Sequence, residues 1–241
     1  MIVLDNFIKN KEILWELQKG TDIFFENTYN NGIKDYNKDL DIDVTPGYWW
    51  SGWWNRKPKN MNELLIEYIM KHNNPLEYYA STNEGFFMHN KFKGFEYWTH
   101  IHSNDKITHN KTEIIPRKNL GWHTNKDDIT YERYGKLIHP LLSVIYWPIP
   151  MEVEGGYLEI SSIRELDSPE ESDLETCNQC NQEIYTDNVQ RIQPKYNRIV
   201  IFDPSYYHRV LDVEKGIRYT FVIDIWSKEN LIKEKSNEHL S

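Results

Sequence analysis

The sequence predicts a mainly β protein (α+β), a jelly roll or barrel with N-terminal helices packed on the outside of one sheet. Apolar residues recur with a helical period only before residue 75. From there to residue 226, short apolar runs alternate with turn residues, mostly Gly, Pro, Asn and Asp. A helical beginning followed by a series of strands is typical of a β core supported by a few outer helices.

Two N-terminal segments have the pattern of amphipathic helices. The first covers 5–19, where Asp5 is expected to cap the helix. The second covers 61–72, with Asn60 or Asn62 near its start. The predicted apolar stripes are Phe7, Ile8, Ile13, Leu14 and Leu17 in the first helix, and Leu64, Leu65, Tyr68 and Ile69 in the second.

Four tryptophans lie between these helices in the segment GYWWSGWW, residues 47–54. Aromatic side chains bury large areas and contribute strongly to cores. We therefore favour packing in the core or under a lid for this segment over a substrate-binding aromatic surface.

The strands of the β core are expected where apolar runs are bounded by turn residues. They are predicted over 84–90, 94–102, 141–147, 156–162, 198–203, 208–213 and 217–226. The polar, acidic stretch 164–195 is expected to be an insertion loop on the surface. The charged tail 227–241 is expected to be a short helix or a frayed end.

The chain of 241 residues is expected to form one domain, because barrels and sandwiches of this size often stay single. Within it, 1–75 would be the helical support and 84–226 the jelly-roll core. The two cysteines, Cys177 and Cys180, do not make a disulfide framework. Two loop thiols are favoured over half of a zinc site, because no second pair exists.

The net charge of −9 argues against a general nucleic-acid binder, which would carry a basic face. The first residues lack the apolar run of a signal peptide. No stretch has the roughly 18 apolar residues that a membrane helix needs. We therefore expect a cytoplasmic protein without a membrane segment.

The clearest functional pattern lies in 197–226, NRIVIFDPSYYHRVLDVEKGIRYTFVIDIW. Its strands 208–213 and 217–226 flank a Glu-Lys-Gly turn and are predicted to form a hairpin. In the second strand the odd positions are all apolar, which predicts one buried face. Arg218 and Thr220 then share the opposite face.

An arginine in so apolar a strand needs an anionic partner. The guanidinium of Arg218 fits a carboxylate, with which it can make two parallel hydrogen bonds. An internal salt bridge to Asp203 or Asp224 is the alternative.

Two histidines far apart in the sequence are candidate metal ligands. His208 is predicted on the strand next to that of Arg218, and His123 lies in the segment GWHTNKDD, residues 121–128. Two imidazoles and one oxygen ligand on one side of a metal, with open positions opposite, form the facial triad of non-haem iron oxygenases. A rival first pair, His100 and His102, is followed by Asp105 but lies early for this role.

The order of these features resembles that of iron(II)- and 2-oxoglutarate-dependent oxygenases, in particular the prolyl-4-hydroxylase-like branch. Five features follow one another over 94–226. They are a histidine motif, a strand ending in Tyr146, the sequence GGYLEI (155–160), a distal histidine and an arginine ten residues later. The resemblance implies a double-stranded β-helix, a cupin-like jelly roll. It assigns iron to His123 and His208, and the far carboxylate of 2-oxoglutarate to Arg218 and Thr220, with Tyr146 as a further co-substrate contact.

The chain departs from that family at one ligand. The family has H-x-D, whereas this chain has His123-Thr124-Asn125. Asn125 is then the metal ligand, or Asp127 reaches the metal after a local shift. In a third alternative the position stays open, as in related iron halogenases.

The resemblance implies a dioxygenase that hydroxylates an unidentified substrate and converts 2-oxoglutarate to succinate. Its cofactors would be Fe(II) and 2-oxoglutarate, with ascorbate as an optional reductant. Its partners would be 2-oxoglutarate, dioxygen and a protein side chain or small molecule, with nucleic acid disfavoured and the oligomeric state open. Asn125 supports one alternative, a non-catalytic binding module, and a cupin-type metalloenzyme is another.

Overall fold

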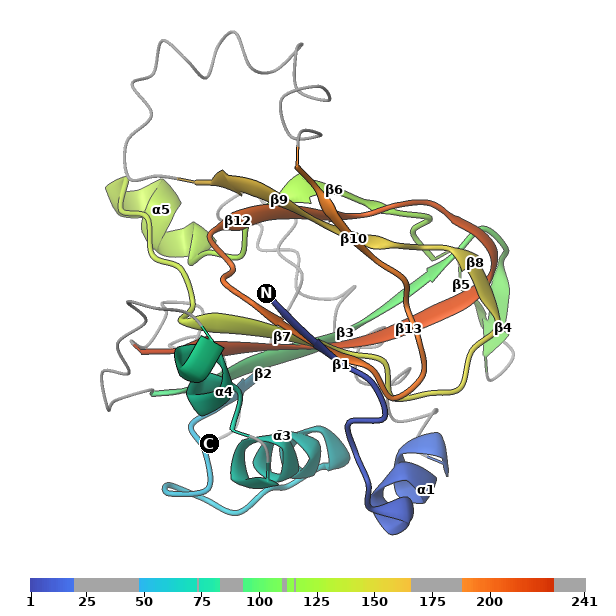
Figure 1. Ribbon diagram of the computed structural model, residues 1–241, viewed down its shortest axis with the longest axis horizontal. Helices are drawn as coiled ribbons and strands as arrows, with labels where there is room; N and C mark the ends of the chain where they lie inside the picture. Colours follow the sequence, from blue (N-terminus) through green and yellow to red (C-terminus); the bar gives the residue numbers. More distant parts are fainter. Residues whose placement is uncertain are drawn as a thin grey trace, which may run out of the picture.

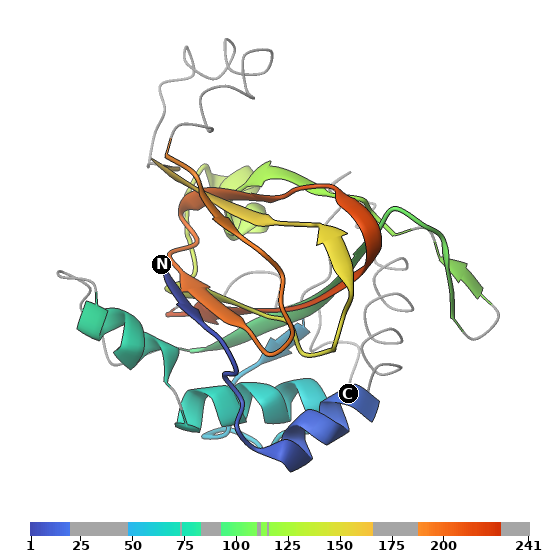
Figure 2. The same ribbon diagram turned by 45° about the vertical axis from the view of Figure 1, so that its right-hand side comes forward.

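The computed structural model describes residues 1–19, 48–72, 74–82, 93–109, 112–114, 116–165 and 188–227. Two antiparallel sheets face each other, and helices cover the outer side of the larger sheet (Figure 1). Figure 2, which is turned by 45°, shows the two sheets curving toward each other as in a jelly roll. The predicted mainly β fold with outer N-terminal helices is confirmed.

The larger sheet has the strand order β1-β11-β7-β13-β3-β2, and every pairing along it is antiparallel. Its strands are β1 (Ile2–Leu4), β2 (Tyr48–Trp50), β3 (Gly94–Ser103), β7 (Leu142–Tyr146), β11 (Ile199–Phe202) and β13 (Val213–Trp226). β13 pairs with β7 on one edge and with β3 on the other, so its backbone is shielded along most of its length.

The smaller sheet has the order β10-β9-β12-β6. Its strands are β6 (Leu120–His123), β9 (Leu158–Arg164), β10 (Gln190–Ile192) and β12 (Tyr206–Val210). The short strand β8 (Val153–Gly155) pairs with the beginning of β13. Strands β4 (Ile107–His109) and β5 (Thr112–Ile114) form a separate ribbon of two strands.

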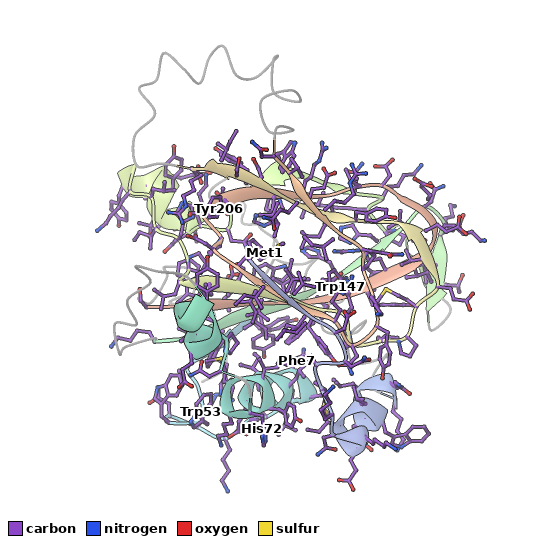
Figure 3. The ribbon with its side chains drawn as sticks, viewed as in Figure 1. Met1, Phe7, Trp53, His72, Trp147 and Tyr206 are labelled. Carbon is purple, nitrogen blue, oxygen red and sulfur yellow. The ribbon has the colours of Figure 1, made fainter. Side chains whose placement is uncertain are left out.

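Among the described residues, three helices lie on the outer face of the larger sheet, and a fourth follows β6 (Figure 1). They are α1 (Lys11–Lys19), α3 (Met61–His72), α4 (Pro75–Thr82) and, after β6, α5 (Asp128–Tyr134). The first three bury Leu17, Leu65 and Leu76 in the larger hydrophobic cluster, against the apolar side chains of the sheet. Phe7 belongs to the same layer and lies between the sheet and the helices (Figure 3).

Strand alternation divides the larger sheet into an outer and an inner face. On β13, Phe221, Ile223 and Ile225 belong to the cluster under the helices. Val222 belongs to a second cluster, which it shares with Leu158 of the smaller sheet. The buried odd face predicted for this strand is therefore confirmed from Phe221 to Ile225, whereas Ile217 and Tyr219 are only partly buried. The even face points between the two sheets.

The predicted hairpin of 208–213 and 217–226 is wrong. The Glu214-Lys215-Gly216 segment is not a turn but part of β13, which begins at Val213. β12 pairs with β9 and β6, whereas β13 pairs with β3, β7 and β8. Consecutive strands therefore belong to opposite sheets, because the chain crosses from one to the other after Val210.

The first helix is shorter than predicted, and its cap is a different residue. α1 begins at Lys11, and the side chain of Asn10 accepts hydrogen bonds from the backbone N–H groups of Glu12 (2.9 Å) and Ile13 (3.2 Å). The capping role predicted for Asp5 is wrong. Its carboxylate instead binds Arg198, and charge pairing with this guanidinium and with Lys195 holds its pKa well below the usual range.

The second helix matches the predicted 61–72. The side chain of Asn60 accepts from the N–H of Glu63 at 2.9 Å, which identifies Asn60 as its cap. The buried stripe is shifted from the prediction, because Leu64 is 48% exposed whereas Ile66 and Met70 are buried.

The tryptophan-rich segment packs in the core, as the sequence favoured. Trp50 on β2 is fully buried, and its ring lies 5.7 Å from that of Phe95. Trp53 packs partly buried against the same cluster, while Trp54 is 44% exposed.

Several predicted segments lie wholly or mostly outside the described residues. They are the predicted strand over 84–90 and the charged tail from residue 228. Most of the predicted insertion 164–195 also lies outside, namely residues 166–187, which include Cys177 and Cys180. None of the helices in the described ranges is long and apolar enough to cross a membrane.

Asn197 fastens the N-terminal segment to the larger sheet. Its side-chain oxygen accepts from the N–H of Ile8 (2.9 Å) and from the hydroxyl of Tyr146 (3.1 Å), and its amide nitrogen donates to the carbonyl of Ile8 (3.0 Å). Its backbone has φ of 56°, a left-handed conformation that Asn tolerates better than most residues. One buried side chain thus satisfies both backbone groups of Ile8.

We predict that Asn197→Gly lowers the free energy of unfolding by about 2–4 kcal/mol, because it leaves buried polar groups of Ile8 without partners. Glycine keeps the positive φ, so the loss reports the hydrogen bonds and not backbone strain. Urea denaturation measures the change. The matched control is Asn188→Gly, at an exposed position with φ of 60°. It should change stability by at most about 0.5 kcal/mol, and an equal loss in both variants would contradict the prediction.

Candidate functional site

A cavity between the two sheets collects most of the candidate residues. It holds about 360 Å³ of space not occupied by protein, part of it open to solvent. Its lining comes from both sheets and from the segment after β6: Trp98, His100, His102, Leu120, His123, Asn125, Ile145, Leu158, His208, Val210, Arg218, Thr220 and Val222. The even face of β13 therefore forms part of one wall.

His123 and His208 lie side by side on the smaller sheet. They are register partners on the antiparallel strands β6 and β12, and their ring centroids are 4.2 Å apart. Residues 85 positions apart in the sequence thus meet because the two strands that carry them are neighbours in the sheet. Both side chains line the cavity.

The hydrogen bonds of these two histidines fix which ring nitrogen carries a proton. Nδ1 of His123 lies 2.8 Å from the carbonyl of Gly121, and Nδ1 of His208 lies 2.9 Å from that of Tyr206. A carbonyl only accepts, so each Nδ1–H donates and each Nε2 keeps its lone pair. Burial lowers the pKa of both imidazoles, which favours the neutral form that binds metals.

His100 and His102 line the same cavity, but from β3 in the larger sheet. The indole N–H of Trp98 donates to Nε2 of His100 at 2.8 Å, and a guanidinium N–H of Arg218 donates to Nδ1 of His102 at 3.3 Å. In each neutral ring the accepting lone pair is occupied, and the other nitrogen carries the proton. These rings are therefore poor metal ligands, which favours His123 over the rival pair.

Arg218 is a buried cation without an anionic partner among the described residues. Its side chain is 1% exposed, and burial lowers the pKa of its guanidinium to about 9. Nη1 donates to the hydroxyl of Thr220 at 2.6 Å. Nε and Nη2 are buried and have no hydrogen-bond partner within the described part of the chain. The alternative of an internal salt bridge is wrong, because Asp203 pairs with Arg164, and Asp224 contacts Ser143 and Asn125.

The Gly155-Gly156 sequence leaves room for the arginine. Gly156 has φ of 63°, and a Cβ atom there would lie 3.1 Å from Cδ of Arg218 and 2.9 Å from Cγ2 of Val213. A larger residue would therefore push the aliphatic part of the arginine side chain out of its place. The glycine pair supports the position of the guanidinium.

The structure places Tyr146 away from the cavity. Its side chain belongs to the cluster beneath the helices, and its hydroxyl donates to the side-chain oxygen of Asn197. The expected co-substrate contact of Tyr146 is therefore wrong, because strand alternation turns it to the outer face. The next residue, Trp147, lies between the sheets, and the guanidinium carbon of Arg218 is 5.5 Å from its ring (Figure 3).

Asn125 lines the cavity, and residues of the larger sheet hold its amide nitrogen. Its amide nitrogen donates to Oγ of Ser143 at 3.0 Å and to Oδ1 of Asp224 at 3.1 Å. The hydroxyl of Ser143 also donates to Oδ1 of Asp224. Burial raises the pKa of Asp224 to about 7, and its hydrogen bonds with Ser143 and Asn125 oppose the rise.

Asp127 does not reach the two histidines. It is the N-cap of α5, and its buried carboxylate accepts from the backbone N–H (2.9 Å) and the hydroxyl (2.8 Å) of Thr130. The alternative in which Asp127 completes the metal site is therefore wrong. Among the described residues, no group of three His, Cys, Asp or Glu side chains could hold a metal ion. Asn125 lines the cavity together with His123 and His208.

His100 and His102 line the cavity and Asp224 contacts Asn125, whereas the sequence pattern predicted no site role for Asp224 and only a rival ligand pair in the two histidines. A detectable signal existed for all three, because each is a polar residue on the even positions of a strand whose odd positions are mainly apolar. The same signal had singled out Arg218. Ser143 carries no such signal, since its role follows only from its register opposite Asp224.

No model of a known protein family matches the chain, and no curated protein matches its sequence. A prolyl-4-hydroxylase from Pseudomonas putida is similar over 95% of this chain and 88% of its own, with 10% identity and a TM-score of 0.49. A prolyl hydroxylase from Trichoplax adhaerens, solved with a hypoxia inducible factor oxygen degradation domain peptide fragment, is similar over 100% and 86%, with 14% identity and a TM-score of 0.48.

A third similar structure is an oxidoreductase of the 2OG-Fe(II) oxygenase family from Burkholderia pseudomallei. It covers 71% of this chain and 58% of its own, with 9% identity and a TM-score of 0.38. These three similar structures are two prolyl hydroxylases and one member of the 2OG-Fe(II) oxygenase family. Because all three TM-scores lie below 0.5, the functional assignment comes from the geometry of the cavity.

We predict that acidification below pH 6.5 destabilises the metal-free protein. Burial lowers the pKa of all four cavity histidines, that of His100 to about 3. The unfolded chain regains pKa values near 6.5 and binds protons that the folded protein does not. Each imidazole that stays neutral in the folded protein then lowers the free energy of unfolding by about 1.4 kcal/mol for each pH unit below 6.5.

Asp224 opposes this trend, because its raised pKa makes the folded protein bind a proton below about pH 7. The effect of this one carboxylate offsets that of one of the four histidines. The free energy of unfolding therefore falls by at most roughly 4 kcal/mol per pH unit. Urea midpoints of the metal-free protein between pH 7.5 and 5.5 measure it. Replacing the exposed His72 by Gln should leave the slope unchanged. A midpoint that stays constant over this range would contradict the prediction.

Proposed function

We propose that the protein is an Fe(II)- and 2-oxoglutarate-dependent dioxygenase that hydroxylates a protein side chain or a small molecule. One observation carries the proposal: two neutral histidines whose Nε2 atoms keep their lone pairs line a single cavity together with a buried arginine, two of whose N–H groups have no partner in the part of the chain that the structure describes. The first pair suits a divalent metal, and the arginine suits a carboxylate. 2-Oxoglutarate, a metal-chelating 2-oxo acid with a carboxylate at its far end, fits both.

The residues present fit the metal. His123, His208 and the side-chain oxygen of Asn125 would hold Fe(II) on one side and leave the other side open, as in a facial triad. The carbonyls of Gly121 and Tyr206 would keep both rings in the orientation and tautomer that a ligand needs. When bound, the iron supplies the activation of dioxygen that couples the decarboxylation of 2-oxoglutarate to hydroxylation of the substrate.

The residues present also fit the co-substrate. Nε and Nη2 of Arg218 lie on one edge of the guanidinium and would make two parallel hydrogen bonds to the far carboxylate of 2-oxoglutarate. Thr220 accepts a hydrogen bond from Nη1, which leaves its own hydroxyl proton available for the same carboxylate. The bound dianion would neutralise a guanidinium that has no anionic partner within the described ranges.

The chain's own contribution to the reaction is orientation and the exclusion of water. The apolar residues of the lining, such as Leu158, Val210 and Val222, limit the water that can reach a bound co-substrate. The neutral state of His100 and His102 keeps further positive charge out of the cavity. Both features favour a dry site in which one substrate C–H bond is presented to the oxidant.

Asn125 in the place of a carboxylate favours one second candidate, a family member that binds 2-oxoglutarate or a partner without turnover. Succinate formation distinguishes the two functions. A cupin-type metalloenzyme without 2-oxoglutarate is the third interpretation, and it predicts that Arg218 has no part in co-substrate binding.

We predict that the purified protein with Fe(II), ascorbate and 2-oxoglutarate releases succinate. Arg218→Ala should raise the concentration of 2-oxoglutarate needed for half-maximal rate by about 100-fold, since a buried bidentate pair is lost. Arg218→Lys should recover only part of this, because a lysine cannot make two parallel bonds. His208→Ala should abolish release.

Tyr146→Phe is the matched control for these variants. It removes one buried hydrogen bond and should lower stability by about 1 kcal/mol while leaving the 2-oxoglutarate requirement unchanged. Binding of 2-oxoglutarate without succinate release, even with surrogate substrates, would favour the non-catalytic module. Metal-dependent activity that needs no 2-oxoglutarate and is unchanged in Arg218→Ala would favour the cupin-type enzyme.

A further inference from the structure

Asp224 is a buried carboxylate for which the described residues provide no cation. It is 1% exposed, and no Lys, Arg or His of the described part of the chain pairs with it. The partners of its Oδ1 atom are neutral, the hydroxyl of Ser143 and the amide of Asn125. A carboxylate buried in this way is costly unless positive charge lies nearby.

The contacts of Asp224 determine which way the amide of Asn125 points. A carboxylate oxygen accepts hydrogen bonds, so the group of Asn125 that lies 3.1 Å from Oδ1 is the amide nitrogen. The same nitrogen lies 3.0 Å from the hydroxyl oxygen of Ser143, whose own proton is donated to Asp224. Both amide protons of Asn125 are thus donated to residues that do not line the cavity, and no hydrogen bond within the described part of the chain engages its side-chain oxygen.

We propose that Asp224 is a positioning residue for the metal: with Ser143 it holds Asn125 so that Oδ1 is presented as a ligand beside His123 and His208. This inference rests on the proposed function. In this arrangement the ligand itself, Asn125, is neutral. The negative charge that an aspartate ligand would bring to the metal lies instead on Asp224, which is hydrogen-bonded to Asn125. The amide is polarised by the carboxylate, and the metal supplies the positive charge that Asp224 otherwise lacks.

The arrangement explains why Asn at this position need not leave the metal site open. An Asn oxygen alone is a weaker ligand than a carboxylate. An Asn whose N–H groups both bind acceptors, one of them a carboxylate, has more negative charge on its oxygen and a fixed orientation. The carboxylate remains part of the site, but β13 provides it instead of the segment after β6.

The test compares Mn²⁺ binding by calorimetry in the full chain, because Mn²⁺ prefers oxygen and imidazole ligands and its binding does not require turnover. Asp224→Leu removes both the acceptor and the charge and should weaken Mn²⁺ binding about 10–100-fold. Asp224→Asn can still accept a hydrogen bond and should lose less. The control Asp203→Asn, at a carboxylate that does not line the cavity, should change nothing.

The exchanged pair Asn125→Asp with Asp224→Asn is the decisive variant. It returns the carboxylate to the ligand position and places the amide behind it, so Mn²⁺ affinity should recover to within about threefold of the unaltered protein. Ser143→Ala, which leaves the buried carboxylate in place, should cause a smaller loss in the same direction. It keeps the test informative if Asp224→Leu does not fold.

A second readout needs no metal. In the ¹H–¹⁵N spectrum of the metal-free protein, the side-chain amide of Asn125 should exchange slowly with water, and faster in Asp224→Leu. Mn²⁺ binding that requires His208 but is equal in all Asp224 variants, with an unchanged Asn125 amide, would overturn this inference and leave the proposed function standing. If the unaltered protein binds no Mn²⁺, the proposed function falls, and the metal role of Asp224 falls with it.

Discussion

The alternation of side chains along β13 is the constraint on which the rest of the structure depends. Its odd residues, Phe221, Ile223 and Ile225, hold the larger sheet against the helices. Its even residues, Arg218 and Asp224 among them, are thereby turned into the space between the sheets. Apolar burial on one face thus forces two charged side chains into the interior on the other.

These two charges give the interior its chemical character. Arg218 is a buried cation without an anion among the described residues, and Asp224 is a buried carboxylate without a cation there. Both lie on one strand face, with the neutral pair His123 and His208 across the cavity on the smaller sheet. A dianionic co-substrate at the arginine and a divalent metal near Asn125 would compensate both charges. We therefore interpret the two buried charges as binding groups for ligands and not as groups that stabilise the fold.

Sequence reasoning succeeded where the pattern was local to one strand. The extent of α3, the apolar face of β13, and the shared face of Arg218 and Thr220 all follow from periodicity within a single element. It failed where partners come from elsewhere. Asp5 resembled a helix cap because its local sequence allows one, but Arg198 and Lys195, about 190 residues away, bind its carboxylate instead.

Two errors had the same cause. The Glu-Lys-Gly segment after His208 is typical of a turn, yet it continues β13, because pairing with β8 holds it extended. The resemblance assigns a co-substrate contact to Tyr146, but Tyr146 lies in the cluster under the helices, and the next residue, Trp147, lies between the sheets. In each case the decision depends on which strands pair and in which register, and no single strand contains that information.

By itself, the sequence determined the class of fold, the burial of Arg218 and the two histidines that could share a metal. Each of these predictions depends only on local periodicity or on residue type. Only the tertiary structure decided that His123 and His208 are neighbours on one sheet, that His102 accepts a hydrogen bond from Arg218, and that Asp127 caps a helix. It also brought Asp224 behind Asn125, 99 residues away. The physical reason is that hydrogen-bond partners and buried charges are satisfied by contacts between distant strands, and these contacts exist only once the sheets have formed.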